Sequence, residues 1–182
     1  MNKKQLFHVI WTSFESFPVW DKKGNWENLA LAYLELKNQG IVFELSKPFQ
    51  QVYLNEKERA EAVVFNEHAI VHLTQDILDL CQPNGDRLVA SLEIEWLDVE
   101  ASKVEMLVWC EANLLHQKIG RLKSRTATLL SFAYPEDYFG KGTWAKGFWY
   151  ARIENQESLA ISILKAHLPK DITAARKGTA ED

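Results

Sequence analysis

The sequence contains little cysteine. Among its 182 residues only Cys81 and Cys110 are cysteines, and they do not form a C-x-x-C pair. Neither a disulfide framework nor a cysteine-rich zinc site is therefore expected. We expect both thiols to be reduced and buried.

Long apolar runs are also missing. No stretch approaches the ~20 apolar residues that a membrane helix needs. The first residues, 1–4 (MNKK), are followed by a strand pattern and not by the apolar core of a signal peptide. We therefore expect a cytoplasmic protein without a membrane partner.

Positive charge is not in excess. The chain has 21 Lys and Arg against 25 Asp and Glu, a net charge of -4, whereas nucleic-acid-binding domains are usually basic. The cations are unevenly distributed, however. They gather in residues 118–125 and 141–152, and the acidic residues gather in 56–79 and 93–111. Any contact with nucleic acid is expected at the two basic segments.

Apolar and aromatic residues are abundant. They make up 47% of the chain, with seven Trp, which is enough for one substantial core. We therefore expect a single domain over residues 1–168. Residues 169–182 are charged and small, and this composition predicts a disordered tail.

The apolar spacing predicts an alternation of strands and helices. Strands are expected at residues 7–14, 41–45, 87–97, 104–110 and 148–153. Helices are expected at residues 25–40, 55–81, 112–132 and 157–167, the second with Asn55 as its N-cap. This order predicts an α+β fold with helices on one face of an antiparallel sheet, and a ferredoxin-like two-layer sandwich is the simplest such fold.

Four segments resemble, in order, the REP-associated tyrosine transposases, relatives of the small HUH transposases of single-strand insertion sequences. They are residues 7–26 (a strand entering an aromatic loop with Pro, Asp and Gly), 54–59 (LNEKER), 113–127, and 142–151 (GTWAKGFWYA). The resemblance extends over residues 7–167. It implies the same ferredoxin-like fold.

The resemblance also implies a metal site and a tyrosine nucleophile, and this chain lacks both. In the family, two strand histidines and a ligand from the last helix hold a divalent metal, and a tyrosine on that helix attacks a DNA phosphate. The histidine positions match Lys103 and Glu105, the tyrosine matches Ile163, and the helix ligand matches His167. A protonated lysine has no lone pair for a metal, and an isoleucine cannot attack phosphorus. We therefore expect no catalysis and no cofactor.

The first hypothesis is a decayed or domesticated relative that retains recognition of single-stranded or hairpin DNA, as a monomer or homodimer. Cations neutralise phosphates, and aromatic rings such as those of Phe148 and Trp149 stack on unpaired bases. The candidate contacts are Lys118, Arg121, Lys123, Arg125, Lys146 and Trp144. Exposed cations on an amphipathic helix are the plainer explanation of the same pattern.

Two alternatives stay open. In the first, the protein is an active DNA transposase or nuclease that uses Mg or Mn held by Glu105, His167 and Asp98. Tyr150 or Tyr138 would then replace the missing nucleophile, although Tyr150 reads as a sheet residue. In the second, the fold is a protein-interaction scaffold whose acidic long helix contacts a partner.

The remaining histidines are expected to be structural. His68 and His72 lie four residues apart on the predicted long helix, a spacing that could place both on one zinc ion. No third ligand can be identified, so they remain weak candidates, like Glu105 and His167. His8 on the first strand and His116 on the third predicted helix have structural explanations.

Overall fold

The computed structural model describes residues 3–14, 16, 19, 26–46, 62–139 and 142–168. Several features singled out in the sequence lie outside these residues. They are the 54–59 segment, the Asn55 cap, Lys141 and the tail 169–182.

In the described residues, five antiparallel strands form one sheet in the order β2-β5-β1-β4-β3. Their bounds are β1 (Lys4–Thr12), β2 (Phe43–Leu45), β3 (Glu93–Val99), β4 (Lys103–Glu111) and β5 (Trp149–Ile153). The central strand β1 pairs with β4 from Lys4 opposite Glu111 to Thr12 opposite Lys103. The predicted α+β class and antiparallel sheet are therefore confirmed.

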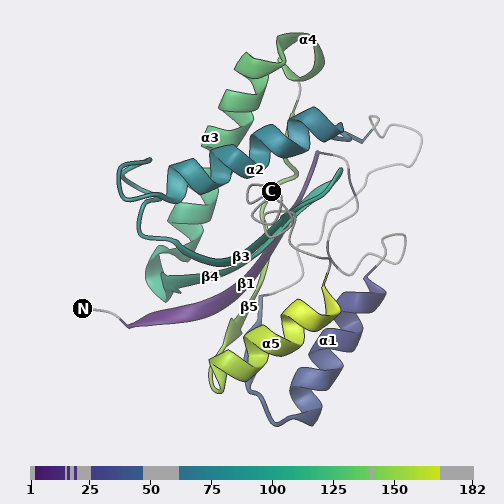
Figure 1. Ribbon diagram of the computed structural model, residues 1–182, viewed down its shortest axis with the longest axis vertical. Helices are drawn as coiled ribbons and strands as arrows, with labels where there is room; N and C mark the ends of the chain where they lie inside the picture. Colours follow the sequence, from purple (N-terminus) through teal and green to yellow (C-terminus); the bar gives the residue numbers. More distant parts are fainter. Residues whose placement is uncertain are drawn as a thin grey trace, which may run out of the picture.

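Helices cover both faces of this sheet, whereas the sequence predicted one face (Figure 1). The helices α1 (Glu27–Asn38) and α5 (Glu157–His167) pack on one side, and α2 (Glu67–Cys81) and α3 (Leu115–Ala133) pack on the other. The expectation that helices cover one face is wrong because alternate residues of β1 pack into two cores, one on each face of the sheet. Among the described residues, no helix has the length and apolar character needed to span a membrane.

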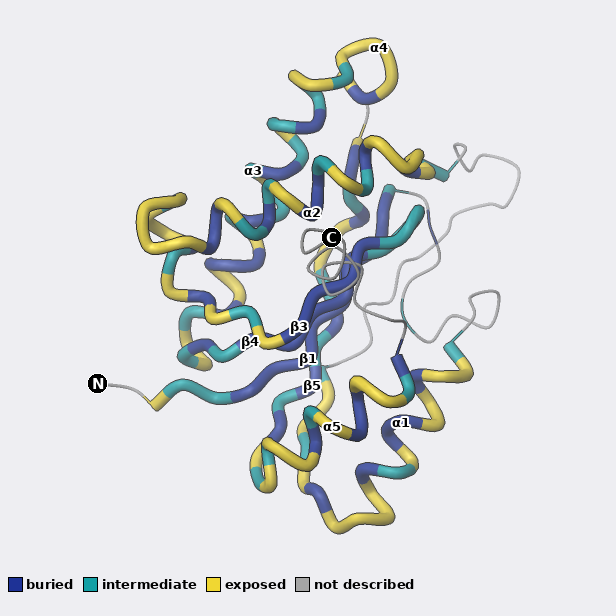
Figure 2. The backbone as a smooth tube through the Cα atoms, viewed as in Figure 1, coloured by how far each residue is buried: buried dark blue, intermediate teal, exposed yellow. Residues whose placement is uncertain are grey.

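The two cores are separated by the central strands, which are dark blue in Figure 2. Phe7, Val9 and Trp11 enter the core beneath α2 and α3. Leu6 and Ile10 enter the core beneath α1 and α5. A strand buried on both faces has an almost continuous apolar sequence, which explains why β1 shows little alternation.

Several element boundaries differ from the prediction. Residues 62–66 are not helical, and α2 begins at Glu67 because the Asn66 side chain accepts a hydrogen bond from the Ala69 N–H at 2.9 Å. Just before this cap, the Phe65 N–H donates to the Ala101 carbonyl at 2.7 Å, a tertiary contact that holds the chain extended. Residues 87–92 form turns and not the start of β3. A short helix, α4 (Pro135–Tyr138), and a 3-10 turn, η2 (Ala112–Leu114), were not predicted.

The outermost strand of the described sheet on the β4 side is β3, and it is irregular. Its pairing with β4 shifts register between Ile94 and Trp96, so that Glu95 is an extra residue of a β-bulge. Lys165 of α5 forms an ion pair with Glu95 at 3.1 Å.

Gly85 is expected to be required for the turn that follows α2. A Cβ atom at this position would lie 2.3 Å from the Asp79 carbonyl oxygen and 2.6 Å from that of Leu80. Gly85→Ala is therefore expected to lower the free energy of unfolding by roughly 1–3 kcal/mol, as overpacking does. Gly120→Ala is the matched control, because a Cβ there meets nothing within 4 Å and alanine favours a helix by about 0.5–1 kcal/mol. Urea denaturation of both variants measures the contrast, and equal effects would contradict the expectation.

Candidate functional site

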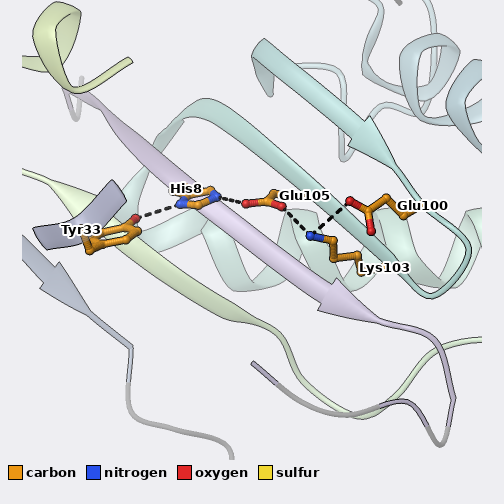
Figure 3. A network of polar contacts seen from close by, with 5 residues as sticks. All are labelled: His8, Tyr33, Glu100, Lys103 and Glu105. Carbon is orange, nitrogen blue, oxygen red and sulfur yellow. Dashed lines mark hydrogen bonds and ion pairs between the residues drawn. The ribbon is translucent and has the colours of Figure 1, made fainter. Parts of the chain in front are cut away.

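Lys103 and Glu105 form an ion pair on β4. They lie two residues apart on one strand, so their side chains project from the same face of the sheet. The Lys103 ammonium donates to Glu105 Oε2 at 3.0 Å and lies 3.3 Å from Glu100 Oε1. The two positions that the resemblance assigns to metal-binding histidines therefore hold a cation and a carboxylate bound to each other (Figure 3).

The structure adds His8 to this pair. His8 lies on β1, is fully buried, and has Nε2 2.7 Å from Glu105 Oε1 and Nδ1 2.8 Å from the Tyr33 hydroxyl. A carboxylate oxygen only accepts, so Nε2 carries a proton. In the neutral ring, Nδ1 accepts a hydrogen bond from the Tyr33 hydroxyl; in the imidazolium, Nδ1–H donates one to the Tyr33 oxygen. Either state satisfies all three groups.

We call the set Tyr33, His8, Glu105, Lys103 and Glu100 the buried polar chain. It extends from α1 across β1 and β4 to the β3–β4 turn (Figure 3). Buried polar groups are tolerated when they are hydrogen-bonded. Each member of the buried polar chain has a partner within it.

The protonation states of the buried polar chain depend on these contacts. Burial acts to raise the pKa of Glu105, but the hydrogen bond and charge of His8, together with Lys103, outweigh burial and hold this pKa below its ordinary value. Burial acts to lower the pKa of Lys103, but Glu105 and Glu100 raise it overall. Burial and the Glu105 charge raise the pKa of Tyr33 well above its ordinary value. Glu105 is thus an anion and Lys103 a cation at neutral pH.

Asp98 lies beside the buried polar chain. It stands opposite Glu105 in the β3–β4 register and is 2% exposed. Its Oδ2 atom is buried and has no hydrogen-bond partner among the described residues. Burial, then the nearby Glu100 and Glu105 carboxylates, raise the pKa of Asp98 to about 7, against the opposing effect of Lys103.

Aromatic rings enclose the buried polar chain. The His8 ring stacks on Tyr33 with centroids 5.8 Å apart and meets the Trp149 ring edge-on at 5.5 Å. The Lys103 ammonium lies 5.6 Å from the centre of the Trp26 ring, at the start of α1. His8 and Lys103 occupy both oxygens of the Glu105 carboxylate, and the protonated Lys103 ammonium has no lone pair to offer a metal.

The two α5 positions are separate from this ion pair. Ile163 is buried in the core that contains Ile10 and Trp149. His167 lies one helical turn further and bonds to Glu35 of α1. Within the described part of the chain, no hydrogen bond or ion pair joins either residue to Lys103 or Glu105.

The weak metal candidates do not converge. His68 is exposed, while His72 lies 3.3 Å from Asp76 on the next turn of α2. Across residues 3–46 and 62–168, so far as they are described, no group of three or more His, Cys, Asp or Glu side chains is placed to hold a metal ion. Cys81 and Cys110 are buried and free, as predicted.

The two lysines of the predicted DNA-contacting helix are used internally. Lys118 is buried and donates to the Leu88 carbonyl at 3.2 Å and to the Ser91 hydroxyl. Lys123 donates to the carbonyls of Ala145, at 2.8 Å, and of Gly147. Burial lowers the pKa of Lys123 to about 8. The hydrogen bonds of both ammonium groups hold neighbouring loops, residues 88–91 and 145–147, against α3.

The other predicted DNA contacts differ in accessibility. Arg121 and Arg125 both pair with Asp86, at 2.9 and 3.6 Å, and keep about 40% of their side-chain surface exposed. Trp144 packs edge-on against Trp11 and donates its N–H to Thr126 at 3.2 Å, so it belongs to the core boundary. Lys146 is exposed.

Comparison with protein-family models gives no match for this chain, and comparison with curated proteins gives none either. The buried polar chain is therefore interpreted from its geometry alone. One signal in the sequence could have revealed it: His8 and Glu105 each interrupt an apolar strand, and two such interruptions suggest a buried pair.

Proposed function

We propose that this protein is a catalytically inactive relative of the REP-associated tyrosine transposases, one that binds single-stranded or hairpin DNA without cleaving it. One observation supports the loss of catalysis most directly. The strand positions that would carry the metal-binding histidines hold the ion pair between Lys103 and Glu105, closed from the other side by His8.

The chemistry of these side chains supports inactivity in two ways. An ammonium repels a divalent cation, and Glu105 could release an oxygen to a metal only by giving up His8 or Lys103. The helix position of the nucleophile holds Ile163, a buried hydrocarbon. Strand cleavage through a phosphotyrosine would therefore need a different tyrosine and a different metal site.

Fewer observations support DNA binding than oppose DNA cleavage. Four of the expected cations are paired within the protein, so a large phosphate-contacting surface on α3 is not favoured. The exposed Lys146 and the half-exposed Arg121 and Arg125 remain for phosphates. A small number of phosphate contacts predicts modest affinity that falls with rising salt.

One DNA substrate can test both halves of the proposal. A labelled hairpin with a single-stranded flank is mixed with the protein in Mn²⁺ or Mg²⁺, using an active transposase of the family as positive control. We expect anisotropy to show binding at low salt that weakens as salt rises, and a denaturing gel to show no protein–DNA adduct. An adduct that disappears in Tyr150→Phe or Tyr138→Phe would overturn inactivity. Absence of binding at low salt would overturn DNA recognition.

A further inference from the structure

Three rings form an aromatic cluster at the junction of β5 and α3. His116, in the first turn of α3, lies 4.9 Å from Phe148 and 5.6 Å from Tyr150, measured between ring centroids. Phe148 and Tyr150 are 5.9 Å apart. His116 is exposed, and both Phe148 and Tyr150 are partly exposed. We call these three residues the ring cluster.

The ring cluster follows from the alternation of β5. Trp149, Ala151 and Ile153 point into the core beneath α1 and α5 and are buried. Tyr150 projects from the other face, where it meets the edge of Phe7. Phe148 and Tyr150 pack against the core beneath α2 and α3 on this face but are only partly buried, so part of their aromatic surface is open to solvent.

Positive charge lies at one end of the ring cluster. Lys146 is exposed two residues before Phe148. The Lys123 ammonium bonds to the carbonyls of Ala145 and Gly147, on either side of Lys146. The Lys123 ammonium thus holds this short loop against α3, and the exposed Lys146 ammonium attracts phosphate.

Negative charge lies at the other end. Arg152 is held by Glu44 and by Glu154, the latter at 2.8 Å. These two carboxylates repel phosphate and limit how far a nucleic-acid strand can follow β5. The rings between Lys146 and Arg152 therefore offer a short stacking surface with one exposed cation, Lys146, at one end.

We infer that His116, Phe148 and Tyr150 are the base-stacking surface for single-stranded DNA, with Lys146 contacting the phosphate that follows. This inference rests on the proposed function. Unpaired bases stack on aromatic side chains whatever their sequence, while neighbouring cations neutralise the backbone. Bases inside a duplex are already stacked, so duplex DNA binds this surface less well. Of the two tryptophans expected from the sequence to stack on bases, Trp149 is buried in the core beneath α1 and α5. Trp144 is held at the core boundary by the hydrogen bond from its N–H to Thr126.

The test uses fluorescence anisotropy with a labelled oligothymidine of about 12 nucleotides at low salt. His116→Ala and Phe148→Leu are each expected to weaken binding by about 5- to 150-fold. Leucine keeps most of the apolar volume that packs against the core at position 148 and removes the aromatic face. Phe132→Ala, which removes a ring that is 75% exposed elsewhere on α3, is the matched control and is expected to bind like the wild type.

A second pair of variants addresses the phosphate contact. Lys146→Ala is expected to reduce the slope of log affinity against log salt by about 0.7, the loss of one single-strand phosphate contact. Lys165→Ala is the control, because it removes an ammonium that pairs with Glu95 away from the ring cluster, and it is expected to leave the slope unchanged. If the wild type binds the oligonucleotide and His116→Ala and Phe148→Leu bind it with the same affinity, the ring cluster is not the stacking site. The proposed function would then still stand. No binding by the wild type would overturn both.

Discussion

Replacing Glu105 with leucine is expected to lower the free energy of unfolding by about 3–5 kcal/mol, the usual cost of breaking a buried charge pair by removing one member. Glu105 is 1% exposed and is the shared partner of His8 and Lys103. Its loss leaves the His8 Nε2–H buried without an acceptor. Urea denaturation measures the change, and Glu93→Gln, in a carboxylate that is 63% exposed, is the control with an expected effect of no more than about 1 kcal/mol.

The double variant His8→Leu with Glu105→Leu separates the contribution of the His8–Glu105 interaction from the contributions of the two single side chains. It removes both members of the His8–Glu105 hydrogen bond at once, so neither is left buried without the other, while Lys103 keeps Glu100 as its partner. We expect the double variant to lose less unfolding free energy than the sum of the losses in the two single variants. The difference, the coupling free energy, is about 1–3 kcal/mol. Simple additivity would show that His8 and Glu105 act independently and would contradict the described hydrogen bond.

Replacing Asp98 with asparagine is expected to remove a pH dependence of stability. The folded protein raises the Asp98 pKa from 3.8 to about 7, so the folded state holds this proton more tightly than the unfolded chain does. The stability that this group contributes is complete below about pH 4 and is lost as the pH rises to about 7. The loss is on the order of 4 kcal/mol, because each pKa unit corresponds to about 1.36 kcal/mol.

Asparagine does not titrate and is neutral, like the protonated acid. The stability of Asp98→Asn relative to the wild type is therefore expected to grow between about pH 5 and pH 7 and then level off. Asp86→Asn is the control. The hydrogen bond from Arg121 holds the Asp86 pKa below its ordinary value, so this residue stays ionised throughout and its variant differs by a constant amount. A constant difference for Asp98→Asn as well would rule out titration of that buried carboxyl.

The sequence identified elements whose pattern is local. Strand β4, strand β5 and helix α5 lie within a residue or so of the expected bounds, because apolar spacing and β-branched content decide them. The start of α2 was misplaced because its cause is tertiary. Phe65 bonds to Ala101 across the fold, and no pattern within the segment reports such a contact.

The site was only half visible in the sequence. Lys103 and Glu105 were assigned to one strand, and β4 confirms that placement. Their neighbour His8 is 97 positions away from Glu105 along the chain, and only the register of β1 against β4 brings the two together. The same limit applies to α3, where helical spacing indicated exposed cations. The groups that bind Lys118 and Arg121 come from the turns before β3, which the sequence alone does not place.

The two rims of the sheet bear on how the protein behaves at high concentration. A regular, uncharged outer strand offers free backbone groups to a strand of another molecule and so promotes aggregation. At one rim the bulge carries Glu95, tied to Lys165; at the other, β2 spans only three residues. Among the described strands, neither rim presents a long flat template, so edge-to-edge growth of this sheet into fibres is disfavoured.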